Sequence, residues 1–475
     1  MTAGQTKHPS GTPGTPGTPG TPGTRRRLIG AAPLLAVAPA ALAACGGPAP
    51  EAAPEARPEG GPPAEVIWTS WATDDLGMSR VKEQADLYAQ EFPRTKVTIA
   101  NVPSAQYQDK LLAGLAGGAA PDVFRDNPAD AIPLIHQGQL LDLDALLKRS
   151  RDSWIGGKDV KPGVMDWGRA RGKQFGFPMG TGAYYAFSVN RNLLRNAGLP
   201  EPPLKYDDPT WTFDRLLDTM RKTTRRSAAG AEQLGIDNGM SWSFLHPLVM
   251  SWGGGFMQPK TGEFRWHEAP ATEAIQWMAD LRLKHQVAPT PEEQSGGLLA
   301  FEKGRSALRW STFNLAMYLL TTVGSQFEWD ILPPVHAQGK KPTIWFYVSW
   351  WVLNKASKVT DAAWNFMHWV AGPKGQRVEV EYTWTAPHYY SLDSKFGLRM
   401  GSAGATKNLA VAQDFMPYAS PERPELNPRY SEALKVLAPA LTRVADGEMT
   451  AKQGMESIKP QMDALLKQGV AEDQQ

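Results

Sequence analysis

Residues 65 to 102 read EVIWTSWATDDLGMSRVKEQADLYAQEFPRTKVTIANV and contain two strand patterns separated by one helix pattern. The opening seven residues are a short apolar run rich in β-forming side chains, and Val97 and Ile99 lie on one face of a second such run. Between the two runs, apolar residues recur at helical spacing: Val81, Ala85, Tyr88 and Phe92. This β-α-β order predicts an α/β fold with a largely parallel sheet.

The next residues extend the alternation with a second helix. Ser104 is expected to cap it, Tyr107, Leu111 and Leu115 form a stripe at helical spacing, and the stretch GGAAP over residues 117 to 121 ends it. In α/β sheets of this kind, ligands bind beyond the carboxyl ends of the strands. We therefore expect functional residues just after the strands.

Composition excludes several classes of protein. The chain of 475 residues is too long for one ordinary core, and 42% hydrophobic residues suffice for two lobes. Outside residues 1 to 44, 46 basic residues face 48 acidic ones, so no nucleic-acid partner is expected. The single cysteine, Cys45, excludes internal disulfides, thiolate zinc sites and iron–sulfur clusters. The eight histidines lack ligand spacing, so we expect no metal and no cofactor.

Residues 1 to 44 have the pattern of an export signal. The stretch TRRRLIGAAPLLAVAPAALAAC runs from three arginines through an apolar segment to small residues before Cys45. The apolar segment is short, rich in Ala and broken by two prolines, which argues against a membrane-spanning helix. Its end resembles a bacterial lipobox, in which the cysteine becomes the lipidated first residue of the mature protein. The alternative is ordinary cleavage after Ala41-Leu42-Ala43, leaving a free thiol. The arginine cluster also resembles a twin-arginine signal.

Two low-complexity stretches flank this signal. The repeats GTPGTPGTPGTPGT at residues 11 to 24 lie upstream of the cleavage point and are not a collagen helix. Residues 45 to 64 combine the expected lipidated cysteine with a Pro/Gly/Ala/Glu linker, which cannot bury apolar surface and predicts an extended tether. The folded part therefore begins near Glu65.

Four stretches, in order, resemble one family. They are AGLAGGAAPDVFRDN at 113 to 127, a segment from GKQFGFPMGTGAYYAFSVN at 172 to 190 into TWTFDRLLDTMRK, FEKGRSALRW at 301 to 310, and DILPPV with WFYVSWWVLNKASKVTDAAWNFMHWVAGPKGQ. Together they resemble the extracellular solute-binding proteins of bacterial ATP-driven importers, in the group that binds oligosaccharides. The similarity covers roughly residues 65 to 470. One departure is that the family often has small residues where this chain has SWW.

The resemblance implies a two-lobe periplasmic-binding-protein-like fold with hinge crossings and a central ligand cleft. We expect the first α/β lobe at residues 65–180 plus 350–390 and the second at residues 183–345 plus 400–470. Binding then needs no chemistry, because the lobes close on the solute and the closed form docks on a permease. The implied partners are a carbohydrate ligand, ABC permease subunits and the membrane, reached through the lipid anchor. The resemblance also implies that the protein is located at the outer face of the bacterial cell membrane and that it is a monomer.

The stretch WFYVSWW at residues 345 to 351 suggests where a sugar would bind. Sugar rings present an apolar C–H face, so their sites need flat aromatic platforms and a few polar groups. If this strand crosses between lobes, Trp350 and Trp351 lie where platforms are needed. The alternative is that the aromatic residues are core, which we expect for Trp345 and Phe346.

Further candidates follow from the family positions. They are Ser70, Trp71 and Asp74 after the first strand, Asp126 and Asn127 after PDVF, Thr181 and Tyr184 at the first crossing, Trp242, Trp310 and Asn314 in the second lobe, and Tyr430 at a late helix. Trp71 could equally close a core. An Asx turn before a proline also explains Asp126 and Asn127.

An enzyme is the competing class. A secreted glycoside hydrolase would also be rich in tryptophan, and Asp74, Asp126 and Asp130 could supply its two carboxyl groups. No nucleophile elbow, zinc motif or phosphate loop occurs in the sequence. We therefore expect a binding protein for a carbohydrate and not an enzyme, with a non-sugar polar solute as the other alternative.

Overall fold

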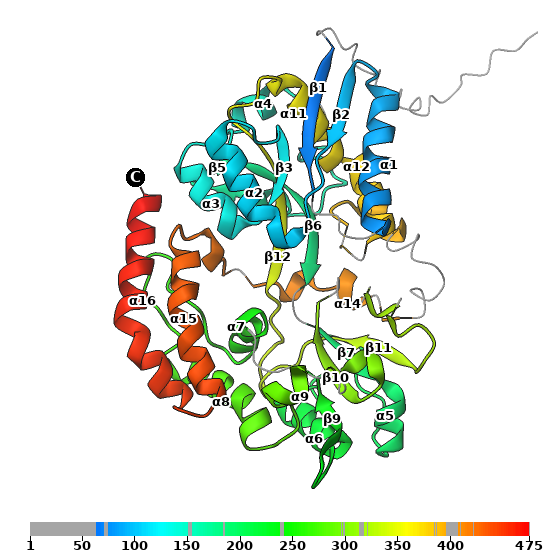
Figure 1. Ribbon diagram of the computed structural model, residues 1–475, viewed down its shortest axis with the longest axis vertical. Coiled ribbons are helices and arrows are strands. Elements are labelled where there is room, and N and C mark those ends of the chain that lie inside the picture. Colours follow the sequence, from blue (N-terminus) through cyan, green and yellow to red (C-terminus); the bar gives the residue numbers. More distant parts are fainter. Residues whose placement is uncertain are drawn as a thin grey trace, which may run out of the picture. The chain divides into compact units, whose positions relative to one another are not determined.

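The computed structural model describes residues 63–474 except for 71–74, 151–153, 184–185, 238–241, 296, 298–299, 313–317, 321, 384, 386, 396–406, 409 and 421. Residues 57 to 475 form one compact unit. The fold is α/β with two lobes, each built on its own five-stranded sheet (Figure 1). In the described part of the chain, none of the helices is both long and apolar enough to span a lipid bilayer.

The first sheet has the strand order β2-β1-β3-β12-β6. Strands β1, β2 and β3 are parallel, whereas β12 is antiparallel to both β3 and β6. The carboxyl ends of β1, β2, β3 and β6 therefore share one edge with the start of β12. The strand bounds are β1 (Ala64–Thr69), β2 (Thr95–Ile99), β3 (Val123–Asp126), β6 (Gly176–Ala183) and β12 (Phe346–Leu353).

Helices cover both faces of this sheet, and we call the sheet with these helices the first lobe. One face packs Trp68 and Trp351 against residues of α1 and α11, and the other packs Phe124 and Trp350 against residues of α2 and α3. Both faces of the central strands are therefore buried, as is usual for α/β sheets covered by helices on both sides. The helices are α1 (Asp75–Glu91), α2 (Ser104–Gly117), α3 (Pro128–His136), α4 (Asp144–Arg149), α11 (Thr360–Ala371) and α12 (Pro373–Tyr382).

The predicted second helix forms, with one correction at its start. Tyr107 and Leu111 are buried as the stripe predicted, and the helix ends at Gly118 in the left-handed conformation, which glycine adopts without strain. Ser104 is not the cap, because the helix begins at Ser104 itself and the cap position, Pro103, makes no side-chain hydrogen bond.

The second sheet has the order β11-β7-β10-β9-β8, and with its helices it forms the second lobe. Strand β10 is parallel to β9 and antiparallel to β7, which also pairs antiparallel with β11. The strands are β7 (Ala186–Asn190), β8 (Arg225–Ser227), β9 (Gly230–Ile236), β10 (Ser306–Ser311) and β11 (Trp329–Leu332). Its core gathers residues from α5 (Arg191–Asn196), α6 (Phe213–Thr223), α7 (Trp242–Ser251), α8 (Ala269–Leu283), α15 (Tyr430–Ala445) and α16 (Ala451–Asp473).

Side-chain caps start two of these helices. Asn190 ends β7 and accepts a hydrogen bond from the Leu193 N–H at 3.1 Å, and Thr212 accepts one from the Arg215 N–H at 3.4 Å. Short elements complete the chain: β4 (Arg169–Ala170), β5 (Lys173–Gln174), α9 (Pro291–Ser295), α14 (Ala410–Gln413), η1 (Met165–Gly168), η2 (Phe301–Lys303), η3 (Tyr390–Lys395), η5 (Met416–Tyr418) and η6 (Pro424–Leu426).

The chain passes between the two sheets at the edges where β6 ends and β7 begins. Strand β6 ends at Ala183 and β7 begins at Ala186, so the Cα atoms of these two residues are at most about 11 Å apart. In the second sheet Ser311, the last residue of β10, pairs with Ala186, and Leu332, the last residue of β11, pairs with Phe187. The edge that receives the crossing is thus also the carboxyl edge of β9, β10 and β11.

Candidate functional site

A chain of hydrogen bonds lies at the carboxyl edge of the first sheet. The Arg125 Nη2 donates to Ser349 Oγ at 3.0 Å, and this hydroxyl donates to Asn127 Oδ1 at 3.0 Å. The Asn127 side chain in turn hydrogen-bonds to Asp130. Hydrogen bonds in such a chain strengthen one another, and each bond restricts the rotation of the side chains that it joins. The chain therefore holds the Asn127 and Asp130 side chains in fixed orientations. Three of these residues, Arg125, Asn127 and Asp130, keep part of their surface exposed.

Asp126 lies behind this network and is fully buried. Its Oδ1 accepts the Asn127 N–H at 2.8 Å, and its Oδ2 has no hydrogen-bond partner among the described residues. Burial, helped by the nearby charge of Asp130, raises the pKa of Asp126 well above its ordinary value. The Arg125 guanidinium opposes this only weakly, because successive strand residues point to opposite faces of a sheet. Burial therefore favours the protonated form of Asp126, whereas Asp130 is the carboxyl group of this pair that keeps exposed surface.

A second acid lies at the carboxyl end of β9. Asp237 is buried, and its Oδ2 accepts the Phe301 N–H at 2.9 Å. Burial raises the pKa of Asp237 to about 7, although Arg309 lies 3.7 Å from the same oxygen and favours the charged form. Its role in the described structure is to hold η2 against β9.

Both tryptophans proposed as platforms are core residues in this structure. Trp350 is 0% exposed among residues of α2 and α3, and Trp351 is 1% exposed with its ring 5.4 Å from that of Trp68. The physical reason is that helices cover both faces of β12, so alternate residues are buried equally. Neither ring has a free face in this structure. Ligand contact by Trp350 or Trp351 therefore stays a prediction, and the burial of both rings argues against it. Trp345 is buried as expected.

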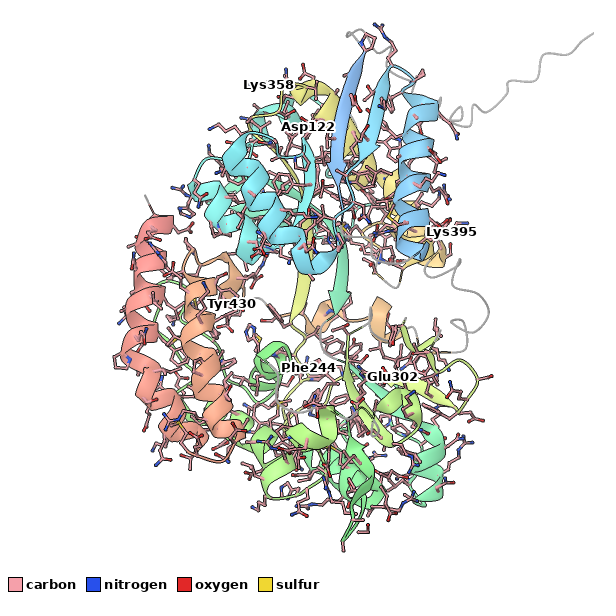
Figure 2. All side chains as sticks on the ribbon, viewed as in Figure 1. Asp122, Phe244, Glu302, Lys358, Lys395 and Tyr430 are labelled. Atoms are coloured by element: carbon pink, nitrogen blue, oxygen red, sulfur yellow. The ribbon has the colours of Figure 1, made fainter. Side chains whose placement is uncertain are left out.

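Phe244 on α7 is the aromatic residue that the sequence interpretation missed. Figure 2 labels Phe244 in the second lobe. Its half-buried ring stacks on that of Trp310 with 5.9 Å between the ring centroids and 24° between the planes, and the Trp310 and Phe187 ring centroids are 4.4 Å apart. Phe187 and Trp310 are both 0% exposed, so Phe244 is the open end of this aromatic column at the carboxyl edge of β10. The sequence did contain a signal for this residue. Leu245 and Leu248 mark the buried face of the helix, and Phe244 lies at the margin of that face, where an aromatic side chain can stay partly exposed.

The remaining candidates are placed as follows. Ser70 directly follows β1 and is 0% exposed, with no partner for its hydroxyl in the described structure, while Tyr430 begins α15 and is also buried. Thr181 belongs to β6 and Trp242 begins α7, but their side chains are not described. Four candidates lie outside the described residues, as does the lipidation candidate Cys45: Trp71, Asp74, Tyr184 and Asn314.

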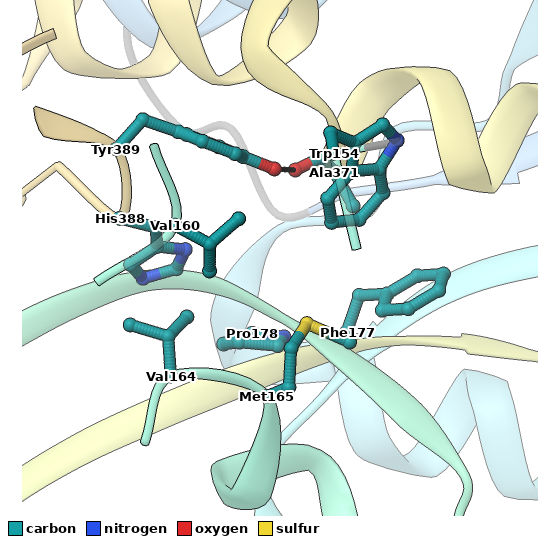
Figure 3. Close-up of a pocket in the computed structure, with 9 residues that line it drawn as sticks. All are labelled: Trp154, Val160, Val164, Met165, Phe177, Pro178, Ala371, His388 and Tyr389. Carbon is teal, nitrogen blue, oxygen red and sulfur yellow. Dashed lines mark hydrogen bonds between the residues drawn. The ribbon is translucent and has the colours of Figure 1, made fainter. Parts of the chain in front are cut away.

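A small cavity in the first lobe is not the solute site. It measures about 10 Å³, close to the least space that holds one water molecule (Figure 3). His388 lines it, and burial, followed by the charge of Lys161, lowers the pKa of this imidazole to about 3. Across the described residues, no group of three or more His, Cys, Asp or Glu side chains could hold a metal ion.

The family model for bacterial extracellular solute-binding proteins matches residues 62–377, about two thirds of the chain. This chain belongs to that family. A solute-binding protein of this family is exported and captures a solute for transport. Among curated proteins, none matches this one.

Solved structures share the fold of this solute-binding protein. An ABC substrate-binding protein of Listeria monocytogenes, in complex with cycloalternan, matches with a TM-score of 0.72 at 17% identity over 84% of this chain and 98% of the other. The GacH receptor of Streptomyces glaucescens, solved unliganded and with acarbose, matches with 0.69 at 17% identity over 85% and 98%. The cyclic α-maltosyl-1,6-maltose binding protein of Arthrobacter globiformis matches with 0.67 at 19% identity over 86% and 100%.

Proposed function

We propose that this solute-binding protein captures a carbohydrate, an oligosaccharide, between the carboxyl edges of its two sheets and delivers it to an ABC permease. The observation that carries the proposal is the pairing of two kinds of group at these joined edges. Asp130 and Asn127 offer oriented polar atoms on the first lobe, and Phe244 offers a partly buried aromatic ring on the second. Flat aromatic surface with a few fixed polar groups is what a sugar ring requires.

The similar structures support a carbohydrate ligand. Cycloalternan, acarbose and cyclic α-maltosyl-1,6-maltose are the ligands of the three similar proteins described above. Each of these is a carbohydrate or resembles one, and each relative has the same two-lobe fold. A binding protein for a non-sugar polar solute is the alternative, since the likeness at these identities is one of fold.

Binding would proceed by closure of the two lobes. We retain the predicted boundaries, 65–180 with 350–390 for the first lobe and 183–345 with 400–470 for the second. Asn127 and Asp130 would accept or donate hydrogen bonds to hydroxyl groups while Phe244 contacts the C–H face. The closed arrangement would be favoured by the extra affinity it has for the solute, and it would dock on the permease as a monomer.

Export and anchoring complete the proposal. Residues 1 to 44 would direct export, Cys45 would carry the lipid, and the Pro/Gly/Ala/Glu linker would tether the folded part to the outer face of the cell membrane. The other predicted contacts, from Ser70, Trp71, Asp74, Thr181, Tyr184, Trp242 and Asn314, stay predictions.

The burial of Asp126 beside the partly exposed Asp130 favours binding over catalysis. A glycoside hydrolase needs two carboxyl groups that both reach the sugar. Asp126 has no exposed surface, so of the neighbouring pair only Asp130 can reach a solute. We therefore propose that the saccharide leaves the protein unchanged.

A saccharide panel tests this function. Thermal denaturation is measured with maltotriose, acarbose, cyclic glucans, and glycerol as a non-saccharide polyol control. A ligand that binds only the folded state raises the melting temperature in proportion to the logarithm of its concentration. We expect at least one oligosaccharide to do so, with no new reducing ends after prolonged incubation. If no saccharide shifts the transition while a different polar solute does, the sugar assignment is wrong, and protein-dependent release of reducing ends would indicate a hydrolase.

A further inference from the structure

Glu422 lies on a segment that passes between the lobes and is bound to the second lobe. Its two carboxylate oxygens each accept the Phe256 N–H at 3.0 Å, and Oε1 also accepts the Met257 N–H at 3.3 Å. Phe256 and Met257 both belong to the second-lobe core. Backbone N–H groups donating to a carboxylate are among the stronger hydrogen bonds in proteins, so this end of the segment is firmly attached.

The next residue, Arg423, is bound to the first lobe. Its Nη1 donates to the carbonyl oxygen of Trp167 at 3.2 Å, and Trp167 packs in the same core cluster as Phe124 and Trp350. Its Nε donates to Glu425 Oε1 at 3.0 Å, and only 3% of the Glu425 side chain is exposed. Leu426 packs against the same first-lobe cluster. Two adjacent side chains therefore hold opposite lobes.

The segment also reaches the helix that carries Phe244. Glu422 Oε2 lies 3.5 Å from Nε2 of His246, whose side chain is 0% exposed. The His246 ring lies 5.1 Å from that of Trp345, which immediately precedes β12 of the first sheet. Because His246 is two residues after Phe244 on α7, the position of Glu422 bears directly on that helix.

We propose that Glu422 and Arg423 are a positioning pair, which fixes α7 and therefore Phe244 relative to the first lobe and so raises affinity for the solute without touching it. This inference rests on the proposed function, because it assumes that the solute contacts both Phe244 and the first lobe. A segment that restricts the relative positions of the two halves reduces the conformational freedom that is lost when the lobes close on the ligand. One peptide unit separates the two anchoring residues, so the coupling path is short and stiff.

A matched pair of variants separates positioning from plain structural support. Arg423→Met keeps the apolar stem and removes the guanidinium. Arg282→Met is the control, because Arg282 also bonds a backbone carbonyl, that of Ala445, and a carboxylate, Asp446, and is equally exposed at 20%. Its contacts join α8 to the end of α15 and stay within the second lobe.

Affinity is measured by calorimetry with maltotriose and acarbose as probes. Arg423→Met is expected to weaken binding about fivefold or more, the lower end of the usual range for coupled sites. Arg282→Met should remain within about twofold of wild type at a similar loss of melting temperature. Arg423→Lys should recover part of the affinity, since an ammonium can reach one of the two acceptors but cannot bridge both. Equal losses of affinity in Arg423→Met and Arg282→Met would overturn the inference, as would no loss in Arg423→Met.

A measurement without ligand keeps the inference separate from the proposed function. Hydrogen exchange reports the Phe256 and Met257 amides, which donate to Glu422 in the second lobe. Arg423→Met, whose lost contact is in the first lobe, should speed exchange at these amides, whereas Arg282→Met should not. Unchanged exchange would overturn the pairing. If wild-type protein binds neither probe, the choice of ligand fails, and the exchange result still decides the pairing.

Discussion

Trp350 lies directly opposite Asp126 in the antiparallel pairing of β12 with β3, and both side chains are 0% exposed. A tryptophan expected to meet a sugar instead covers a carboxyl group expected to bind one. Trp350 therefore gives this carboxyl group an apolar neighbour and helps exclude water from it, in keeping with burial as the largest cause of its raised pKa.

This arrangement predicts how Asp126→Asn changes stability with pH. The folded pKa of Asp126 lies above the ordinary value of 3.8, so between these two values the folded state holds a proton that the unfolded state lacks. The free energy of unfolding therefore falls as pH rises through that window, by up to about 1.4 kcal/mol per pH unit. The amide cannot ionise. We expect Asp126→Asn to match wild type near pH 4 and to melt at a higher temperature near pH 8, as followed by circular dichroism.

Asp142→Asn is the control, because the pKa of Asp142 is shifted in the opposite direction from that of Asp126. Desolvation by burial raises the pKa of Asp142, but Lys173, which donates to Oδ2 at 2.7 Å, the Asp144 N–H, which donates to Oδ1 at 3.0 Å, and the charge of Lys148 together outweigh it, so this pKa is lowered. Its stabilising contribution is present above the ordinary pKa and is lost as pH falls through the folded pKa. This variant should therefore melt slightly below wild type at neutral pH and approach it in acid. A pH profile for Asp126→Asn that runs parallel to wild type would show that Asp126 is not buried as a neutral acid.

Phe244→Ala should reduce solute affinity more than stability. If the partly buried ring contacts the ligand as proposed, removing that contact is expected to cost about 1 to 3 kcal/mol of binding free energy, or tenfold and more in dissociation constant. Titration calorimetry with maltotriose measures the loss, and Phe244→Tyr should retain most of the affinity. The half-buried Leu193, which packs on the same core, gives a matched control as Leu193→Ala. An affinity for Phe244→Ala equal to that of this control would remove Phe244 from the site.

Trp350→Ala should behave as a core substitution. A tryptophan without exposed surface leaves a large cavity on truncation, and such changes typically cost about 3 to 5 kcal/mol of unfolding free energy. Urea denaturation measures this quantity, and Trp350→Phe should lose less because it refills most of the cavity. If Trp350→Ala folds with nearly full stability but loses affinity, then the ring contacts the solute in another arrangement of the lobes, as the sequence predicted.

Cys45→Ser tests the anchor. The serine cannot accept the lipid, so the protein should move from the membrane fraction to the soluble fraction or accumulate unprocessed. Fractionation of cells with immunodetection, and mass spectrometry of the mature amino terminus, measure both outcomes. Wild-type protein that is wholly soluble with an unmodified thiol would refute the lipobox interpretation.

The sequence predicted which edge of the sheet carries the candidate site, but not which residues at that edge a solute can reach. The motif PDVFRDN led to Asp126 and Asn127 because polar residues after a parallel strand gather at one edge. It could not tell that Asn127 and Asp130 are reachable while Asp126 is buried, since that depends on Trp350, more than 220 residues away in the chain. Phe244 was missed for a similar reason, because its exposure depends on Trp310 beneath it.

The sequence by itself determined the features that arise from neighbours along the chain. The strand and helix alternation of residues 65 to 102 and the family motifs depend on local periodicity and on residues that are close in the chain. The tertiary structure alone decided which aromatic rings are covered and which lobes Glu422 and Arg423 hold. The physical reason is that burial and long-range hydrogen bonds depend on the surfaces that packing brings together, and a residue's own type and spacing do not specify its distant partners.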